Sequence, residues 1–127
     1  MVDVEALTVA HLLTDSTVTT LTGTRIGTEI PAGQAWPKVR VFRISGPYVV
    51  GDHLERASLQ IDVWADDKPA AWDVTAVTRK SVLSMWSTSH VLGVVTKVEE
   101  TLGPSWLPDP ETDRPHYMFG AAVYTHP

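Results

Sequence analysis

The chain contains no cysteine. Disulfide bonds, zinc sites built from thiolates and cysteine nucleophiles are therefore excluded, although cytosolic and secreted proteins can both lack cysteine. No apolar run approaches the ~20 residues that span a bilayer, and the segment Met1–Leu7 carries acids where a secretory signal peptide has positive charge. We therefore expect a protein that is made and used in the cytoplasm and has no membrane partner.

Positive charge is also scarce, since the formal net charge is -5 at pH 7. Nonspecific binding to nucleic acid needs Lys and Arg gathered on one surface. The one modest basic cluster, Lys38, Arg40 and Arg43, lies in a predicted strand, where a solvated edge or ordinary salt bridges would explain it. With 43% hydrophobic and 20% charged residues, the 127-residue chain has the composition and length of one globular domain spanning residues 1–127.

The usual motifs that activate chemical groups are missing as well. Gly23–Gly27 is not followed by a predicted helix, so it cannot hold phosphate as a P-loop does, and there is no Gly-x-Ser-x-Gly elbow. His53 and Glu55, beside Asp52, form a His-x-Glu pair, but the cysteine pair of a deaminase zinc site is absent. A solvated hairpin shoulder explains these residues better. We expect no catalytic residue, no metal and no cofactor, and hence no enzyme.

One long alternating segment, Leu54–Trp64, dominates what is present. Every second residue from Ala57 to Ala65 is apolar and the residues between are mainly polar, which is typical of a strand with one core face. Trp64 ends this strand on the polar side, where a small protein gains little from an exposed ring. Two explanations stay open: Trp64 contacts a partner, or the chain's own proline-rich segment covers it.

The remaining pattern predicts an α+β domain. Asp3 caps a helix that runs to about Leu13, Asp66 or Asp67 with Pro69 starts another that runs to about Trp86, and the threonine-rich segment 15–24 breaks the first. Strands are predicted at residues 24–30, 38–45, 54–64, 93–102 and 116–125. The order is helix-strand-strand-strand-helix-strand-strand, with a twisted, mainly antiparallel sheet packed with two helices.

Two long connections interrupt this pattern. Residues 46–53 join the second and third predicted strands as an extended hairpin tip. Residues 103–115 hold four of the nine prolines, so no strand is expected to run through them. Both segments are suited to reach outward.

The second predicted helix carries two apolar sectors. The first, wide enough to cover a sheet, contains Ala70, Val74, Val77, Val82 and Met85. Almost opposite lie Trp72, Ala76 and Leu83. Another segment of the chain or another subunit must cover this second sector, and both options stay open.

Aromatic residues supply most of the candidate interface. Trp and Tyr dominate the energetics of protein interfaces, although they can equally fill a small core beneath long loops. The candidate residues for subunit or partner contact are Trp36, Tyr48, Trp64, Trp72, Leu83 and Trp106.

The order and spacing of these features resemble the tail terminator, or tail completion, proteins of long-tailed, non-contractile bacteriophages. The resemblance covers nearly the whole chain. It rests on an N-terminal helix, a strand ending in Glu29-Ile-Pro31, Trp36-Pro-Lys-Val-Arg-Val, a Gly-rich turn, the strand Leu59-Gln-Ile-Asp-Val-Trp-Ala, an Ala-rich helix after Pro69, and a final strand after a Pro- and Asp-rich loop.

The resemblance implies a structural virion protein that forms a ring, commonly sixfold, caps the completed tail tube and then offers a surface for the head connector. The first implied partner is the chain itself, with its copies arranged as a hexamer. The others are the tail tube protein, the head-tail connector protein, and DNA that passes through the lumen without specific binding. The implied location is the tail or neck of the virion, after assembly in the host cytoplasm. The acidic balance agrees with a channel through which DNA slides.

Two alternatives remain. One is another neck protein of the same kind of virion, such as a head-completion or connector ring. The other is a small cytoplasmic enzyme or ligand-binding domain that uses Asp52, His53 and Glu55.

Overall fold

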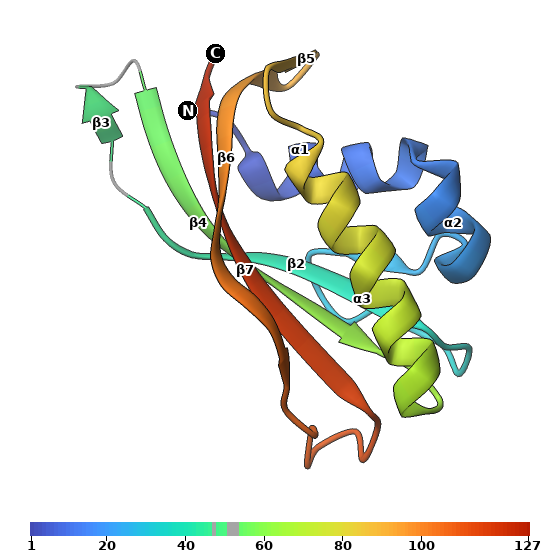
Figure 1. The fold of residues 1–127 in the computed structure, drawn as a ribbon. Coiled ribbons are helices and arrows are strands. Elements are labelled where there is room, and N and C mark those ends of the chain that lie inside the picture. Colours follow the sequence, from blue (N-terminus) through green and yellow to red (C-terminus); the bar gives the residue numbers. More distant parts are fainter. Residues whose placement is uncertain (47, 51–53) are drawn as a thin grey trace.

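A curled β-sheet lies at the centre of the computed structural model, which describes residues 1–46, 48–50 and 54–127 (Figure 1). Within these residues seven strands follow the order β1-β2-β4-β7-β6-β5, with β3 beside β4. Among the described strands only β1 and β2 pair in parallel, so the sheet is mainly antiparallel, as predicted. The strands are β1 (Ile26–Gly27), β2 (Lys38–Ser45), β3 (Tyr48–Val50), β4 (Leu54–Trp64), β5 (Thr88–His90), β6 (Gly93–Trp106) and β7 (His116–His126).

Three helices in the described residues cover one face of this sheet (Figure 1). They are α1 (Val4–Thr14), α2 (Ser16–Thr22) and α3 (Lys68–Leu83). The predicted caps are confirmed: the Asp3 carboxylate accepts a hydrogen bond from the Ala6 N–H at 3.0 Å, and that of Asp67 accepts one from the Ala70 N–H at 2.8 Å. Each cap satisfies an N–H group that the helix itself leaves unpaired.

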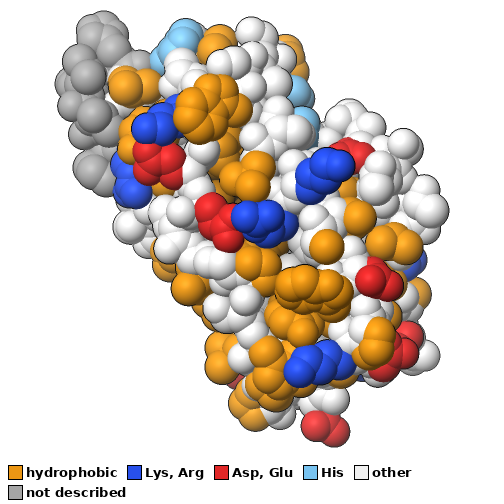
Figure 2. Space-filling model, viewed as in Figure 1, with side chains coloured by type: hydrophobic (Ala, Val, Ile, Leu, Met, Phe, Trp, Pro, Cys, Tyr) orange, Lys and Arg blue, Asp and Glu red, His pale blue; other side chains and the backbone are white. Residues whose placement is uncertain are grey.

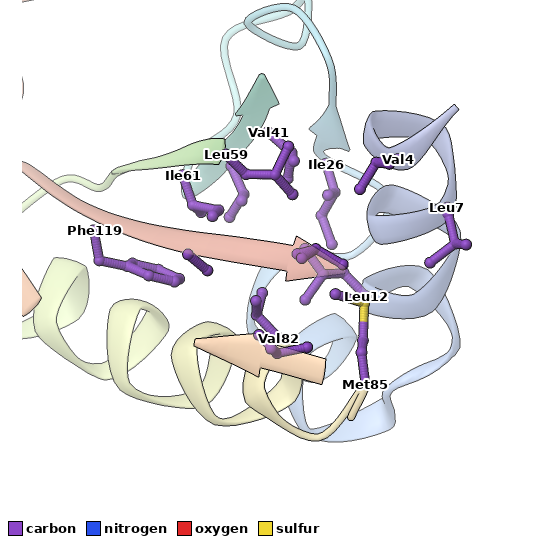
Figure 3. Close-up of a cluster of buried hydrophobic side chains, with 14 of the residues drawn as sticks. Val4, Leu7, Leu12, Ile26, Val41, Leu59, Ile61, Val82, Met85 and Phe119 are labelled. Atoms are coloured by element: carbon purple, nitrogen blue, oxygen red, sulfur yellow. The ribbon is translucent and has the colours of Figure 1, made fainter. Parts of the chain in front are cut away.

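The main hydrophobic core fills the space between the sheet and the helices. Ile61 of β4 stands opposite Val41 of β2 and Phe119 of β7, and all three are fully buried. Figure 3 shows side chains of these strands pointing toward those of the helical layer, among them Leu7, Leu12, Val82 and Met85. Burial of each such side chain contributes roughly 1.5–3 kcal/mol to folding. The alternating apolar residues of β4 therefore predict a strand with one buried face reliably.

The first helix ends before residues 15–24, as predicted, but this segment forms a second helix, α2, which the sequence pattern does not predict. Asp15 ends α1 and also caps α2, because its carboxylate accepts a hydrogen bond from the Thr17 N–H at 3.0 Å. Val18 and Thr22 are then fully buried against the rest of the chain. Tertiary burial therefore outweighs the weak helical propensity of a threonine-rich segment.

The strand predictions need three corrections. The predicted strand at residues 24–30 shrinks to β1, whereas β3 and β5 had not been predicted. The strand predicted to end at residue 102 continues through Pro104 to Trp106. This is possible because the register shifts between Leu102 and Ser105, so the missing N–H of Pro104 interrupts no regular ladder.

The buried face of α3 only partly matches the predicted sector. Val74, Val82 and, beyond the helix end, Met85 are buried, while Ala70 and Val77 are half-buried. The rest of the buried face is formed by Ala71, Thr75, Thr78 and Ser81. Small and polar residues can occupy such positions where a helix packs closely on a sheet, which a hydrophobic pattern does not reveal.

Candidate functional site

An aromatic cluster lies where the N-terminal half of α3 meets the end of the β6–β7 hairpin. The Tyr117 ring is buried, and the rings of Trp72 and Trp106 approach it edge-on, with centroid distances of 5.5 and 5.1 Å. Trp106 stands opposite Tyr117 in the β6–β7 register. The ammonium of Lys68 lies 4.4 Å from the Trp106 ring centroid. We call Lys68, Trp72, Pro104, Trp106 and Tyr117 the aromatic corner.

The aromatic corner is exposed and hollowed. Trp72 and Trp106 leave 49% and 39% of their surfaces accessible, which is unusual for side chains of this size. Beside them, Trp72, Ala76, Arg79 and Pro104 line a hollow of about 210 Å³. Figure 2 shows hydrophobic side chains gathering over this part of α3 and the adjoining hairpin, with basic side chains next to them. Exposed aromatic surface is typical of interaction sites, so the aromatic corner is the candidate site of this chain.

Trp64 does not contribute to this exposed surface. It lies on the polar side of β4, as predicted, but only 2% of its surface is accessible. Its ring stacks on His116 with centroids 5.0 Å apart, and its indole N–H donates to the Asp109 carboxylate at 2.9 Å. The chain's own proline-rich segment therefore covers Trp64, which is the second of the two explanations left open by the sequence.

A buried charge network lies beneath the same segment. Asp62 is 1% exposed and accepts hydrogen bonds from Arg40 at 2.7 Å, from Gln60 at 3.2 Å and from Nε2 of His116 at 2.8 Å. Nδ1 of His116 lies 2.6 Å from the carbonyl oxygen of Leu107. Both partners of the His116 ring can only accept, so the ring satisfies both when it is protonated and donates from both nitrogens.

The pKa directions agree with this protonation state. Burial is the largest single influence on the His116 pKa and opposes the charged ring, but hydrogen bonds to Asp62 and to the Leu107 carbonyl outweigh it and raise the pKa. Burial likewise opposes ionisation of Asp62, but hydrogen bonds from His116, Arg40 and Gln60 outweigh it and lower the pKa of that carboxyl. Both shifts favour the ion pair.

The network anchors the proline-rich segment to the sheet. The Asp109 carboxylate accepts from Trp64 and also from the Glu111 N–H and the Thr112 hydroxyl, each at 3.1 Å or less. Because the oxygens of Asp62 and Asp109 are occupied by these donors, neither carboxylate is placed to act as a general base. The arrangement is suited to hold a loop in position.

The other sequence-predicted residues are dispersed. Trp36 is half-buried, and the cations of Lys38 and Arg114 lie 4.2 and 4.7 Å from its ring centroid. Leu83 packs against the main core, so the chain covers this part of the second α3 sector by itself. Tyr48 belongs to β3, and its side chain is outside the described part of the structure.

The basic cluster and the His-x-Glu pair acquire defined surroundings. Arg40 forms an ion pair with Asp62, and Arg43 forms one with Glu55. Ordinary salt bridges therefore explain these two residues of the basic cluster. Glu55 is 3% exposed, so its assignment to a solvated shoulder is wrong: pairing with the Arg43 guanidinium allows the carboxylate to be buried. Asp52 and His53 lie outside the described residues.

Comparison with known proteins places the chain in a family. A family model described as "Tail completion protein gp17" matches residues 6–120. The chain belongs to the tail completion protein family. No curated protein matches at a significant level. A chain in a solved structure titled "Virion of native gene transfer agent (GTA) particle" has the same fold, with a TM-score of 0.76 over 97% of this chain and 94% of that chain, at 16% sequence identity.

Membership of the tail completion family identifies the general class of this protein. Proteins of this family are structural components of the virion and not enzymes, so the enzyme alternative built on Asp52, His53 and Glu55 is set aside. In the described residues no helix is long and apolar enough to cross a membrane. The sequence had singled out Trp72 and Trp106, but it missed Lys68, Pro104 and Tyr117. The spacing of Lys68, Trp72 and Ala76, four residues apart on one helix, was the available signal.

The buried charge network around Asp62 and His116 should make the stability of the fold depend on pH. A raised folded pKa of His116 means that its contribution is complete below the unfolded value of about 6.5 and is lost as pH rises through the folded pKa. We expect the urea midpoint to fall between about pH 6 and about pH 9. In His116→Gln this fall should be reduced. An equal fall in both proteins would contradict a protonated His116.

At low pH, the contribution of Asp62 to stability changes with pH in the opposite direction. Because the folded pKa of Asp62 is lowered, its contribution is present above about 3.8 and is lost as pH falls through the folded pKa. The charge network therefore stabilises the fold most in the window between about pH 4 and about pH 6.5.

Proposed function

We propose that this tail completion protein forms a ring of identical subunits that caps the finished tail tube and then presents a surface to the head-tail connector. The observation that carries the proposal is the aromatic corner, in which Trp72 and Trp106 remain about half and more than a third exposed on a folded chain. A free monomer gains nothing from these exposed rings, whereas a subunit that assembles can bury them against a partner.

The ring is proposed on symmetry grounds and from the resemblance of the sequence to tail terminators, which commonly form sixfold rings. A ring needs a heterologous contact, in which one patch of a subunit meets a different patch of the next. The aromatic corner is a candidate for one side of that contact. The net charge of -5 agrees with a lumen through which DNA passes without specific binding.

The proposed partners are the tail tube protein on one side of the ring and the head-tail connector on the other. Binding tests with each partner separate this proposal from a connector ring of the same virion. The full chain, tagged after Pro127, should bind the open ends of preformed tail tubes in the absence of portal and adaptor proteins. The C-terminus lies at the end of the sheet away from the start of α3, which keeps the tag off the aromatic corner (Figure 1).

A tail terminator should also arrest tube growth. Added to polymerising tube protein, it should shorten the tubes as its concentration rises, because each capped end stops growing. Binding to portal or adaptor without binding to tubes would favour the other neck role and would contradict the proposal.

A further inference from the structure

We propose that the aromatic corner of one subunit receives the β1–β2 loop, residues 28–37, of a second copy of this chain. In this contact Ile30 packs on Trp72 and Trp106, and Glu29 lies near Lys68. The inference rests on the proposed ring, for which it names the repeating contact.

The exposed side chains of the β1–β2 loop match those of the aromatic corner. Ile30 is 40% exposed, and Glu29 beside it is exposed too. Glu29 is the only charged residue between Arg25 and Lys38, so the loop presents an apolar side chain next to a single negative charge. The aromatic corner presents two exposed indole rings next to the positive charge of Lys68. The two surfaces are complementary in both polarity and charge.

The two surfaces lie on opposite faces of the sheet. Ile30 lines a hollow with Asp62 of β4 and His116 of β7, on the polar face, whereas Trp72 and Tyr117 lie on the face that α3 covers. A contact between them therefore joins one patch of a copy to a different patch of the next. Such a contact is head-to-tail, and it closes a ring where the rotation between copies allows.

Other contacts between copies fit less well. Val91 in the β5–β6 turn is 94% exposed, but residues 89–93 around it include no acidic side chain that could pair with Lys68. Direct pairing along the outer edge of β6 meets register shifts near Thr96, Thr101 and Pro104, features that oppose strand addition. The β1–β2 loop is therefore the better occupant.

Because the chain has no cysteine, engineered pairs can test the contact directly. Ala76 is exposed and lines the hollow beside Trp72. Ile30→Cys and Ala76→Cys, mixed as single variants with tail tubes under mild oxidation or a short bismaleimide, should give a cross-linked dimer. The double variant should give a ladder that ends in a closed ring. Val91→Cys mixed with Ala76→Cys is the matched control and should give no more dimer than Ala76→Cys alone.

A charge exchange tests the polar part of the same contact. Glu29→Lys and Lys68→Glu should each weaken ring formation by about fivefold, the range of one exposed ion pair. The double exchange should restore it, whereas two independent defects would add.

The outcomes separate the two proposals. If rings form on tube ends but the Ile30→Cys and Ala76→Cys pair does not cross-link and the charge exchange does not rescue, the loop contact is wrong and the ring proposal stands. If no ring or cap forms under any condition, both proposals are wrong.

Discussion

Trp64→Ala is expected to lower the free energy of unfolding by about 3–5 kcal/mol, as for other buried tryptophans. The substitution removes a ring that is 2% exposed and stacked on His116, and it leaves a cavity between β4 and the proline-rich segment. It also removes the indole donor to Asp109. Urea unfolding of the full chain, followed by circular dichroism, measures the loss.

Trp64→Phe is the matched control for this experiment. Phenylalanine keeps an aromatic ring against His116 but has no N–H for Asp109, whose carboxylate still accepts from Glu111 and Thr112. We expect a smaller loss, about 1–2 kcal/mol. A loss below about 1 kcal/mol for Trp64→Ala, together with weakened assembly, would instead place Trp64 at a subunit interface.

Trp72→Ala is expected to have the opposite profile. Trp72 is 49% exposed, so its removal should change the free energy of unfolding by only about 1 kcal/mol, mainly through its contact with Tyr117. Assembly, in contrast, should weaken by at least about tenfold, because central tryptophans in interfaces contribute about 2 kcal/mol or more. Sedimentation of the protein with tail tubes, over a range of concentrations, measures this effect.

Trp86→Ala is the control for Trp72→Ala. Trp86 is 51% exposed, which nearly equals the exposure of Trp72, but it lies beyond the C-terminal end of α3. Its removal should leave assembly within about twofold of the unmodified chain. Equal defects in the two variants would mean that loss of any exposed indole weakens assembly, and would contradict a specific role for the aromatic corner.

The elements that the sequence predicts well are those specified by local chemistry. The bounds of β2 and β4 agree with the predictions because their alternating residues face a buried core on one side, and α3 starts where Asp67 can cap it. The threonine-rich α2 and the continuation of β6 through Pro104 were missed. Both depend on tertiary contacts, namely the burial of Val18 and the pairing of Trp106 with Tyr117 across a register shift.

The candidate site was predictable only in part. The tryptophans could be selected as candidate interface residues, but the covering of Trp64 depends on Asp109, which lies 45 residues further along the chain. The same limit applies to Leu83, which the helical pattern places opposite the core and which the fold nevertheless packs against it. Periodicity describes one helix or strand at a time, whereas these contacts join separate segments.

Electron microscopy of the purified chain mixed with tail tubes is the most direct test of the proposed function. We expect a ring of this protein at one end of each tube, and a loss of those rings when Trp72 is replaced by alanine. A chain that stays monomeric at every concentration and leaves both tube ends bare would contradict the proposed function.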